Sequence, residues 1–267
     1  MASLGHDPWV AITNVRVIIQ WWWEQTLAPA TREREMKCSA TGTVGMILAG
    51  PGLACAALVG LNLEEHAVDG EPGYTTWRLY AEFDSASDQL TSVGGANPTV
   101  GAVISPTGFY QNTFCGPLSS YVNEAFVGFI PSIQYDSWVT IGGEWMTDSA
   151  TLSSVGVDFT SFEAGNDLFI ANGEWTRPLN DPHAFGQVIG GMPNFQVLVG
   201  QFTVAGYGPG TAPWGQLNLS GYSESFGPGG DLVPWSAENV SFGTPLPAPG
   251  ALALLGIVGV AGRRRRR

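Results

Sequence analysis

Residues able to do catalytic chemistry are scarce in the central part of this 267-residue chain. Between residues 68 and 243 there is one histidine, His183, one cysteine, Cys115, and no lysine. A Ser-His-Asp triad could use only His183, a zinc site would need more ligands, and neither residue lies in a recognisable local motif. The sequence therefore predicts a protein without enzymatic activity or cofactor, in which Cys115 is a small buried apolar residue.

Carboxylates are plentiful, and they leave one enzymatic alternative open. Glu144, Glu163 and Glu174 are candidates by residue type for a glycan hydrolase. Such an enzyme needs two carboxyl groups about 5 to 9.5 Å apart in a cleft. The competing interpretation is a solvated acidic surface, which we favour.

Two acidic turns contain oxygen ligands of the kind that Ca²⁺ prefers. One turn supplies Glu163, Asn166 and Asp167, and the other supplies Asp181. Neither turn has the spacing of an EF-hand loop. These four residues are the calcium candidates, against the interpretation of plain surface residues.

Six tryptophans lie between residues 68 and 243. An exposed indole ring can stack on a sugar ring, and jelly-roll domains often carry lectin sites. Trp175, Trp214 and Trp235 are the candidates for glycan stacking, whereas Trp77 lies on an apolar face and is expected in the core. A secreted carbohydrate-binding, lectin-like module is therefore the first alternative function, and packing in the core is the competing interpretation.

Short strands separated by Gly- and Pro-rich turns must position these side chains. Residues 76–84 alternate between apolar and polar faces, and similar patterns occur at 138–141, 155–159, 217–219 and 240–242. Between 195 and 204 the apolar parity changes, which a β-bulge near Gly200 would correct. Because no helical period is evident, the sequence predicts an all-β fold, an antiparallel β-sandwich or jelly roll.

Charge is distributed unevenly along the chain. The formal net charge is −12, and residues 68–243 carry two basic residues against seventeen Asp and Glu, a net of −15. A phosphate backbone is bound by a basic face, so this balance argues against nucleic acid as a partner. Basic residues gather instead near the two ends, as is typical of targeting signals attached to an acidic domain.

The region before residue 68 has the composition of a signal segment. Met36 and Lys37 precede a mostly apolar run over residues 43–61 that ends among small residues. A basic start, a short apolar run and an Ala-x-Ala-type exit are typical of a secretory signal peptide, so we expect cleavage after Ala56, with Ala67 as second choice. Residues 1–35 make no physical sense in front of such a peptide. We therefore expect translation to start at Met36, with a real N-terminal extension as the alternative.

The C-terminus has three parts in sequence. A proline-rich motif, Pro247, Ala248 and Pro249, is followed by an uncharged run and then by five arginines, Arg263, Arg264, Arg265, Arg266 and Arg267. The run of about 13 residues would form roughly 20 Å of helix, which is short for a bilayer core of about 30 Å. Such an arginine cluster would hold the C-terminus on the cytoplasmic side of the membrane.

This tail resembles the PEP-CTERM sorting signal, with Ala248 in place of the glutamate of the Pro-Glu-Pro motif. The resemblance covers about 24 of the 267 residues. It implies a short transmembrane helix in the inner membrane, processing by an exosortase-type enzyme, and export in bacteria that make exopolysaccharide.

The sequence thus predicts four parts: an N-terminal extension (1–35), a signal-peptide region (36–67), a β-sandwich domain (68–243) and a sorting tail (244–267). Its predicted role is that of an exported, non-enzymatic protein of the cell envelope or extracellular matrix. Its expected partners are the inner membrane, an exosortase-type enzyme and exopolysaccharide. Anchoring by the tail is expected to be transient.

Overall fold

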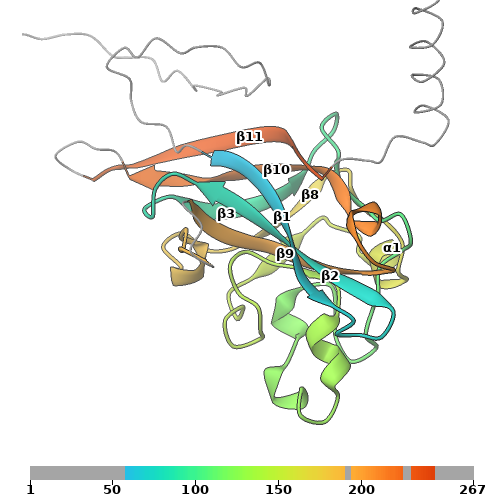
Figure 1. The fold of residues 1–267 in the computed structure, drawn as a ribbon. Coiled ribbons are helices and arrows are strands. Elements are labelled where there is room, and N and C mark those ends of the chain that lie inside the picture. The colour runs from blue at the N-terminus through green and yellow to red at the C-terminus, as the bar shows by residue number, and fades with distance from the viewer. Residues whose placement is uncertain (1–57, 190–193, 225–229, 244–267) are drawn as a thin grey trace, which may run out of the picture. The chain divides into compact units, whose positions relative to one another are not determined.

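The computed structural model describes residues 58–189, 194–224 and 230–243, which form two antiparallel β-sheets (Figure 1). Sheet A has the strand order β1-β2-β9-β5. Sheet B has the order β6-β8-β3-β10-β4-β7, and β11 also pairs with β10. The strands are β1 (Leu58–Val68), β2 (Tyr74–Phe83), β3 (Gln89–Gly95), β4 (Gly101–Ile104), β5 (Trp138–Val139), β6 (Ser153–Val155), β7 (Leu168–Ile170), β8 (Gly173–Thr176), β9 (Phe195–Ala205), β10 (Trp214–Glu224) and β11 (Leu232–Phe242).

Helical structure in these ranges is confined to short turns. They are α1 (Thr160–Glu163) and the 3₁₀ turns η1 (Ser119–Tyr121), η2 (Glu124–Phe126), η3 (Pro131–Tyr135), η4 (Pro182–Ala184) and η5 (Pro209–Thr211). The predicted all-β sandwich is therefore confirmed.

The main core lies between the two sheets. On β2, the alternating Trp77, Leu79, Ala81 and Phe83 are all buried, as the sequence pattern predicts. In the pairing of β2 with β9, Leu79 lies opposite Gly200 and Tyr80 lies opposite Leu198. Strand β9 therefore contains one extra residue at this point. This confirms the predicted β-bulge, which turns the apolar residues on both sides of it toward one core.

A second, smaller cluster lies on the other face of sheet A. Tyr80 and Leu198 point away from the main core and pack with Val122, Ile133 and Trp138. The long segment between β4 and β5, green in Figure 1, therefore covers part of the outer face of sheet A.

Strand β1 includes residues before the predicted domain boundary at residue 68. Strand β1 pairs with β2 along its length, and Leu61 and Leu63 pack against the main core. The end of the apolar run that resembles a signal peptide is thus a strand. Cleavage after Ala56 would leave β1 intact, whereas cleavage at Ala67 would remove it.

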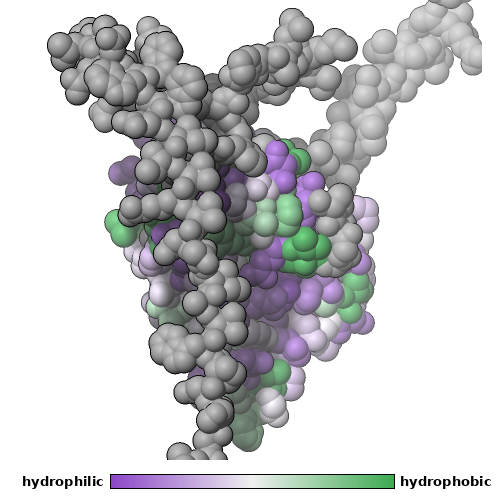
Figure 2. Space-filling view, turned by 90° about the vertical axis from the view of Figure 1, so that its left-hand side faces the viewer, coloured by the Kyte–Doolittle hydropathy of each residue, from purple (hydrophilic) through white to green (hydrophobic). Residues whose placement is uncertain are grey.

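The strand pattern predicted around residues 155–159 is only partly correct. Strand β6 ends at Val155, whose side chain is 68% exposed, while Val157 and Phe159 are half-buried against the core. Val155 lies opposite Glu174 in the strand register, on the outer face of sheet B, where its side chain meets solvent. In Figure 2 most of the visible described surface is hydrophilic, with separate hydrophobic patches.

Several predictions concern residues outside the described ranges. These are the N-terminal extension, the signal peptide as far as residue 57, and the sorting tail with Pro247, Ala248, Pro249 and the five terminal arginines. Within the described ranges, no helix is long and apolar enough to cross a bilayer.

Candidate functional site

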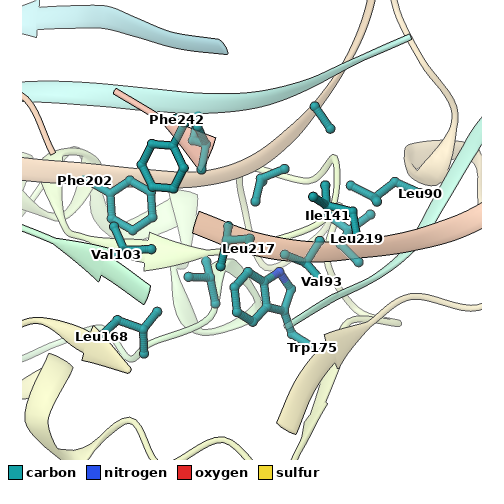
Figure 3. Close-up of a cluster of buried hydrophobic side chains, with 14 of the residues drawn as sticks. Leu90, Val93, Val103, Ile141, Leu168, Trp175, Phe202, Leu217, Leu219 and Phe242 are labelled. Carbon is teal, nitrogen blue, oxygen red and sulfur yellow. The ribbon is translucent and has the colours of Figure 1, made fainter. Parts of the chain in front are cut away.

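The tryptophans proposed for glycan stacking are mostly buried. Trp175 is fully buried between the sheets, where Figure 3 shows it pointing into the cluster with Val93 and Leu217, and its Nε1 donates to the Thr140 carbonyl at 2.9 Å. Trp235 is 9% exposed and packs edge-on against Phe83. The prediction is therefore wrong for Trp175 and Trp235, because both fall on the inward face of their strands. Trp214, at the start of β10, is half-buried.

The calcium candidates do not converge. Asp167 Oδ1 accepts from the Ser105 backbone N–H at 2.9 Å, whereas Asp181 Oδ1 accepts from Arg177 at 2.9 Å. Asn166 directs its amide nitrogen, not its oxygen, toward a neighbouring carbonyl. Across the described ranges, no group of three or more His, Cys, Asp or Glu side chains could hold a metal ion.

The three glutamates considered for hydrolysis lie on different elements. Glu144 belongs to the groove on sheet A, Glu174 to the outer face of sheet B, and Glu163 to α1. The Cys115 thiol and His183 line different hollows. Burial, with the nearby Asp136 carboxylate, raises the pKa of Cys115 to about 12, so the thiolate nucleophile is disfavoured.

The carboxyl group of Asp136 lies next to the Cys115 thiol, and its pKa is strongly raised. It is fully buried, and its Oδ1 accepts from the Asn112 backbone N–H at 2.6 Å, while its Oδ2 has no partner. Burial raises the pKa of Asp136 to about 8. The structure thus contains a carboxyl group that is protonated at neutral pH, away from both surfaces described next.

The sheet-B trough, on the outer face of sheet B, carries a row of hydroxyl groups. In the strand register, Ser236 on β11 lies opposite Ser220 on β10, and Ser220 lies opposite Ser92 on β3. The row continues from Ser92 to Thr176 on β8 and from Thr176 to Ser153 on β6. Because neighbouring strands lie about 4.8 Å apart, these five hydroxyls extend over about 19 Å across the strands.

The adjacent residues show that this row faces outward. Leu219, Val93 and Trp175, each next to a member of the row, are buried in the core. Successive side chains in a strand point to opposite faces, so the hydroxyls point to solvent. The Ser153 and Thr176 hydroxyls lie 3.1 Å apart, which shows how regular the row is at its β6 end.

Small residues next to the row make a hollow of about 190 Å³. Gly94, opposite Asn218 and Glu174, has no room for a side chain because a Cβ atom would meet the Gly173 carbonyl oxygen. The carboxylates of Glu174 and Glu238 border the hollow.

An exposed aromatic ring lies on the same face of sheet B. Phe169 on β7, 57% exposed, is opposite Ala102, which is opposite Gln216 on β10. Gln216 is four residues from Ser220 on β10, so Phe169 lies two rows, or about 13 Å along the strands, from the hydroxyl row. The sequence did not single out Phe169, because a three-residue strand gives too short a pattern to show which side chain points outward.

The sheet-A groove is a hollow of about 230 Å³ on the outer face of sheet A. It is lined by Arg78, Tyr80, Gly142, Glu144, His183, Phe185, Gln187, Ile189, Gln196, Val197 and Leu198. The two nitrogens of the Arg78 guanidinium donate to the two oxygens of Glu144, each at 2.8 Å. Its Nε donates to Gln201 Oε1 at 3.1 Å, so three of the five N–H groups of Arg78 are bonded within the chain.

Gln196 joins two further carboxylates beside the groove. Its Nε2 lies 3.1 Å from Glu64 Oε1 and 3.1 Å from Glu82 Oε1, so these oxygens are no more than about twice that distance apart. The amide of Gln196 thus occupies the space between the two carboxylates. Gln196 is 1% exposed, and its Oε1 has no partner.

Histidines lie near the groove as well. His183 Nδ1 is 3.4 Å from Asp181 Oδ1, and its Nε2 is 3.9 Å from Asp148 Oδ1. Although burial acts the other way, hydrogen bonds from Thr151, the His183 backbone and Arg177 lower the pKa of Asp181 to about 2. Sequence analysis did not identify His66, because residues 36–67 were assigned to the signal segment. The alternation of apolar residues over 61–63 could have shown that His66 belongs to a strand.

His66 lies on β1, near the Arg78–Glu144 pair. Burial and the positive charge of Arg78 lower the pKa of His66, and so favour its neutral form. The groove is therefore a set of fixed hydrogen-bonding groups, without a nucleophile held against a base.

A comparison with protein-family models, with curated proteins and with solved structures gives no match to this chain.

Proposed function

We propose that this chain is an exported, non-enzymatic protein of the bacterial cell envelope or extracellular matrix, which associates with exopolysaccharide through the sheet-B trough. The observation that carries the proposal is the row of five outward hydroxyls across β11, β10, β3, β8 and β6. Hydroxyl groups both donate and accept hydrogen bonds, as do the hydroxyls of a sugar chain.

The dimensions of the trough favour an extended chain. An extended β-linked pyranose chain advances by about one strand spacing per sugar, so a row of about 19 Å fits about four sugars. The carboxylates of Glu174 and Glu238 repel acidic glycans, so the trough favours a neutral one.

Export is supported by the C-terminal tail. The proline motif, the apolar run and Arg263–Arg267 resemble a PEP-CTERM signal, which implies passage through the inner membrane and removal by an exosortase-type enzyme. Mass spectrometry of the protein outside the inner membrane tests this part. A mature form that retains the five arginines would show that the tail is a permanent anchor.

The glycan part is tested with the purified full chain on a glycan array, followed by titration with neutral β-linked oligosaccharides of two to six sugars. We expect affinity to rise up to about four sugars and then to level off. The triple variant Ser92→Ala, Ser220→Ala, Ser236→Ala removes three hydrogen-bonding groups. At about 1 kcal/mol each, or about 3 kcal/mol together, it should weaken binding about a hundredfold.

Two further variants separate recognition from folding. Thr176→Val keeps the shape of the side chain and removes only its hydroxyl, so it should weaken binding without lowering the melting temperature much. Ser154→Ala is the matched control, since Ser154 is exposed and lies beside the row without belonging to it. Equal binding by wild type and the triple variant would overturn the glycan proposal, and release of shortened sugars would show a hydrolase instead.

A further inference from the structure

The aromatic hollow, of about 410 Å³, lies where the segment between β4 and β5 meets strand β6. The rings of Phe114, Tyr121 and Phe159 line it, together with the Cys115 thiol and the Ser154 hydroxyl. Phe114 is 68% exposed and Tyr121 is 55% exposed, so these two rings are accessible from solvent. The volume falls within the range of about 300 to 1,000 Å³ that is typical of small-molecule pockets.

The chain holds the walls of the hollow in place. A Cβ atom at Gly116 would lie 3.0 Å from Cδ2 and 3.2 Å from Cγ of Tyr121, so the tyrosine ring rests on the glycine backbone. Cys115, which lines the hollow, packs against the buried cluster that includes Val122 and Trp138. The hollow is therefore formed before any ligand arrives, as most small-molecule sites are.

The hollow has uncharged walls within a strongly acidic domain. Residues 68–243 carry a net charge of −15, and both arginines of this region are paired with carboxylates elsewhere. Burial raises the pKa of Cys115 to about 12, and the negative charges of Asp136 and Glu163 raise it further. The thiol that lines the hollow thus lies in a negative potential, which attracts a cation.

The polar groups of the hollow limit the kind of cation. Among the described residues that line it, the polar side chains are the hydroxyls of Ser154 and Tyr121 and the thiol of Cys115, without a carboxylate or an amide. A primary ammonium or a guanidinium group would lose hydrogen bonds to water there and gain few in return. A quaternary ammonium group has no N–H to satisfy, and aromatic rings attract it through their faces.

We propose that the aromatic hollow binds a small soluble quaternary ammonium compound of the choline type. Its methyl groups contact the rings of Phe114, Tyr121 and Phe159, and the acidic domain supplies the complementary charge. Anionic membrane surfaces repel such a domain, which favours a soluble compound over a lipid headgroup. Ser154 points to the opposite face of β6 from Ser153, so this site is separate from the hydroxyl row and does not depend on the function proposed for the sheet-B trough.

The test is an NMR titration of the full chain with choline, neohexanol, ethanolamine and glucose. Neohexanol has the shape of choline with a carbon atom in place of the nitrogen, so it lacks the charge. Choline should bind about tenfold more tightly than neohexanol or ethanolamine, and its methyl protons should shift upfield because the ring faces shield them. Added salt should weaken the binding of choline but not that of neohexanol.

Phe114→Leu removes one ring and keeps an apolar side chain at an exposed position. It should weaken choline binding about three- to tenfold and leave neohexanol binding unchanged. Tyr121→Leu is an equivalent variant if Phe114→Leu does not fold. Phe129→Leu is the matched control, because Phe129 is 85% exposed on the same segment and does not line the hollow.

The possible outcomes are distinct. Selective binding of choline that Phe114→Leu weakens and Phe129→Leu leaves intact supports the proposal. Equal affinity for choline and neohexanol, or no binding of choline, overturns it. Tighter binding of glucose than of choline also overturns it, since the hollow would then be a sugar site. Sedimentation of the chain with phosphatidylcholine vesicles, reversed by free choline, overturns the soluble source and shows a lipid headgroup instead.

Discussion

The buried carboxyl group of Asp136 makes stability depend on pH in an unusual direction. In the unfolded chain an aspartate ionises near pH 3.9, whereas in the folded domain burial raises the pKa of Asp136 to about 8. Between these values the unfolded state releases its proton and the folded state keeps it. This group therefore lowers the free energy of unfolding as pH rises from about 4 to 8, by at most about 1.4 kcal/mol per pH unit.

Asp136→Asn should remove this dependence. The asparagine keeps an oxygen for the Asn112 N–H and replaces the unpartnered Oδ2 with an amide that faces the Cys115 thiol. In wild type the negative charge of the neighbouring Glu163 opposes ionisation of both Asp136 and Cys115. The neutral asparagine is not subject to this repulsion. At pH 8 the variant should be more stable than wild type by a few kcal/mol, and near pH 4 the two should be similar.

The measurement is urea unfolding of wild type and variant at half-unit steps from pH 4 to 8.5. Asp158→Asn is a control of opposite sign, because hydrogen bonds from the side chain and backbone of Thr160 lower the pKa of the exposed Asp158. If wild type and Asp136→Asn have the same slope against pH, or if the variant is less stable at pH 8, the reasoning about Asp136 is refuted.

Three other results are expected. Cys115 should resist iodoacetamide at pH 8 in the folded protein and react after unfolding, since its thiol pKa is about 12; rapid alkylation of native protein would contradict this. Arg177→Met should lower the free energy of unfolding, measured in urea, by about 3 to 5 kcal/mol, because it leaves the Asp181 carboxylate without its cation. If it lowers that free energy by less than Ser154→Ala does, the ion pair is unimportant for stability. Calcium should raise the melting temperature no more than sodium of equal ionic strength, since the four candidate ligands do not converge; a larger calcium effect would reveal a site that the contacts do not show.

Sequence patterns within single strands predicted which face of a strand is buried and where a bulge occurs. The alternation on β2 identified the buried face, and the parity change on β9 located the bulge next to Gly200. The two candidate sites could not be predicted in this way. Gln196 meets Glu64 across 132 positions of the chain, and Arg78 meets Glu144 across 66, so no motif spacing records either contact.

The hydroxyl row illustrates the same limit. Ser92 and Ser220 are ordinary residues in their own strands, and only the register of β3 on β10 brings them into one row. For the aromatic residues, the sequence shows the residue type but not whether the side chain points into the core or to solvent. Trp175 occupies the inward position of a four-residue strand, and Phe169 the outward position of a three-residue one.

The order in which the strands pair has a consequence for the timing of folding. Strand β2 pairs with β9 from Tyr74 to Ala205, and β3 pairs with β10, so both sheets need partners from the far end of the chain. Folds dominated by such distant pairings form slowly. A chain that crosses a membrane N-terminus first could complete neither sheet until β9, β10 and β11 had emerged. It would therefore stay unfolded, and able to pass a narrow channel, until shortly before its tail reached the membrane.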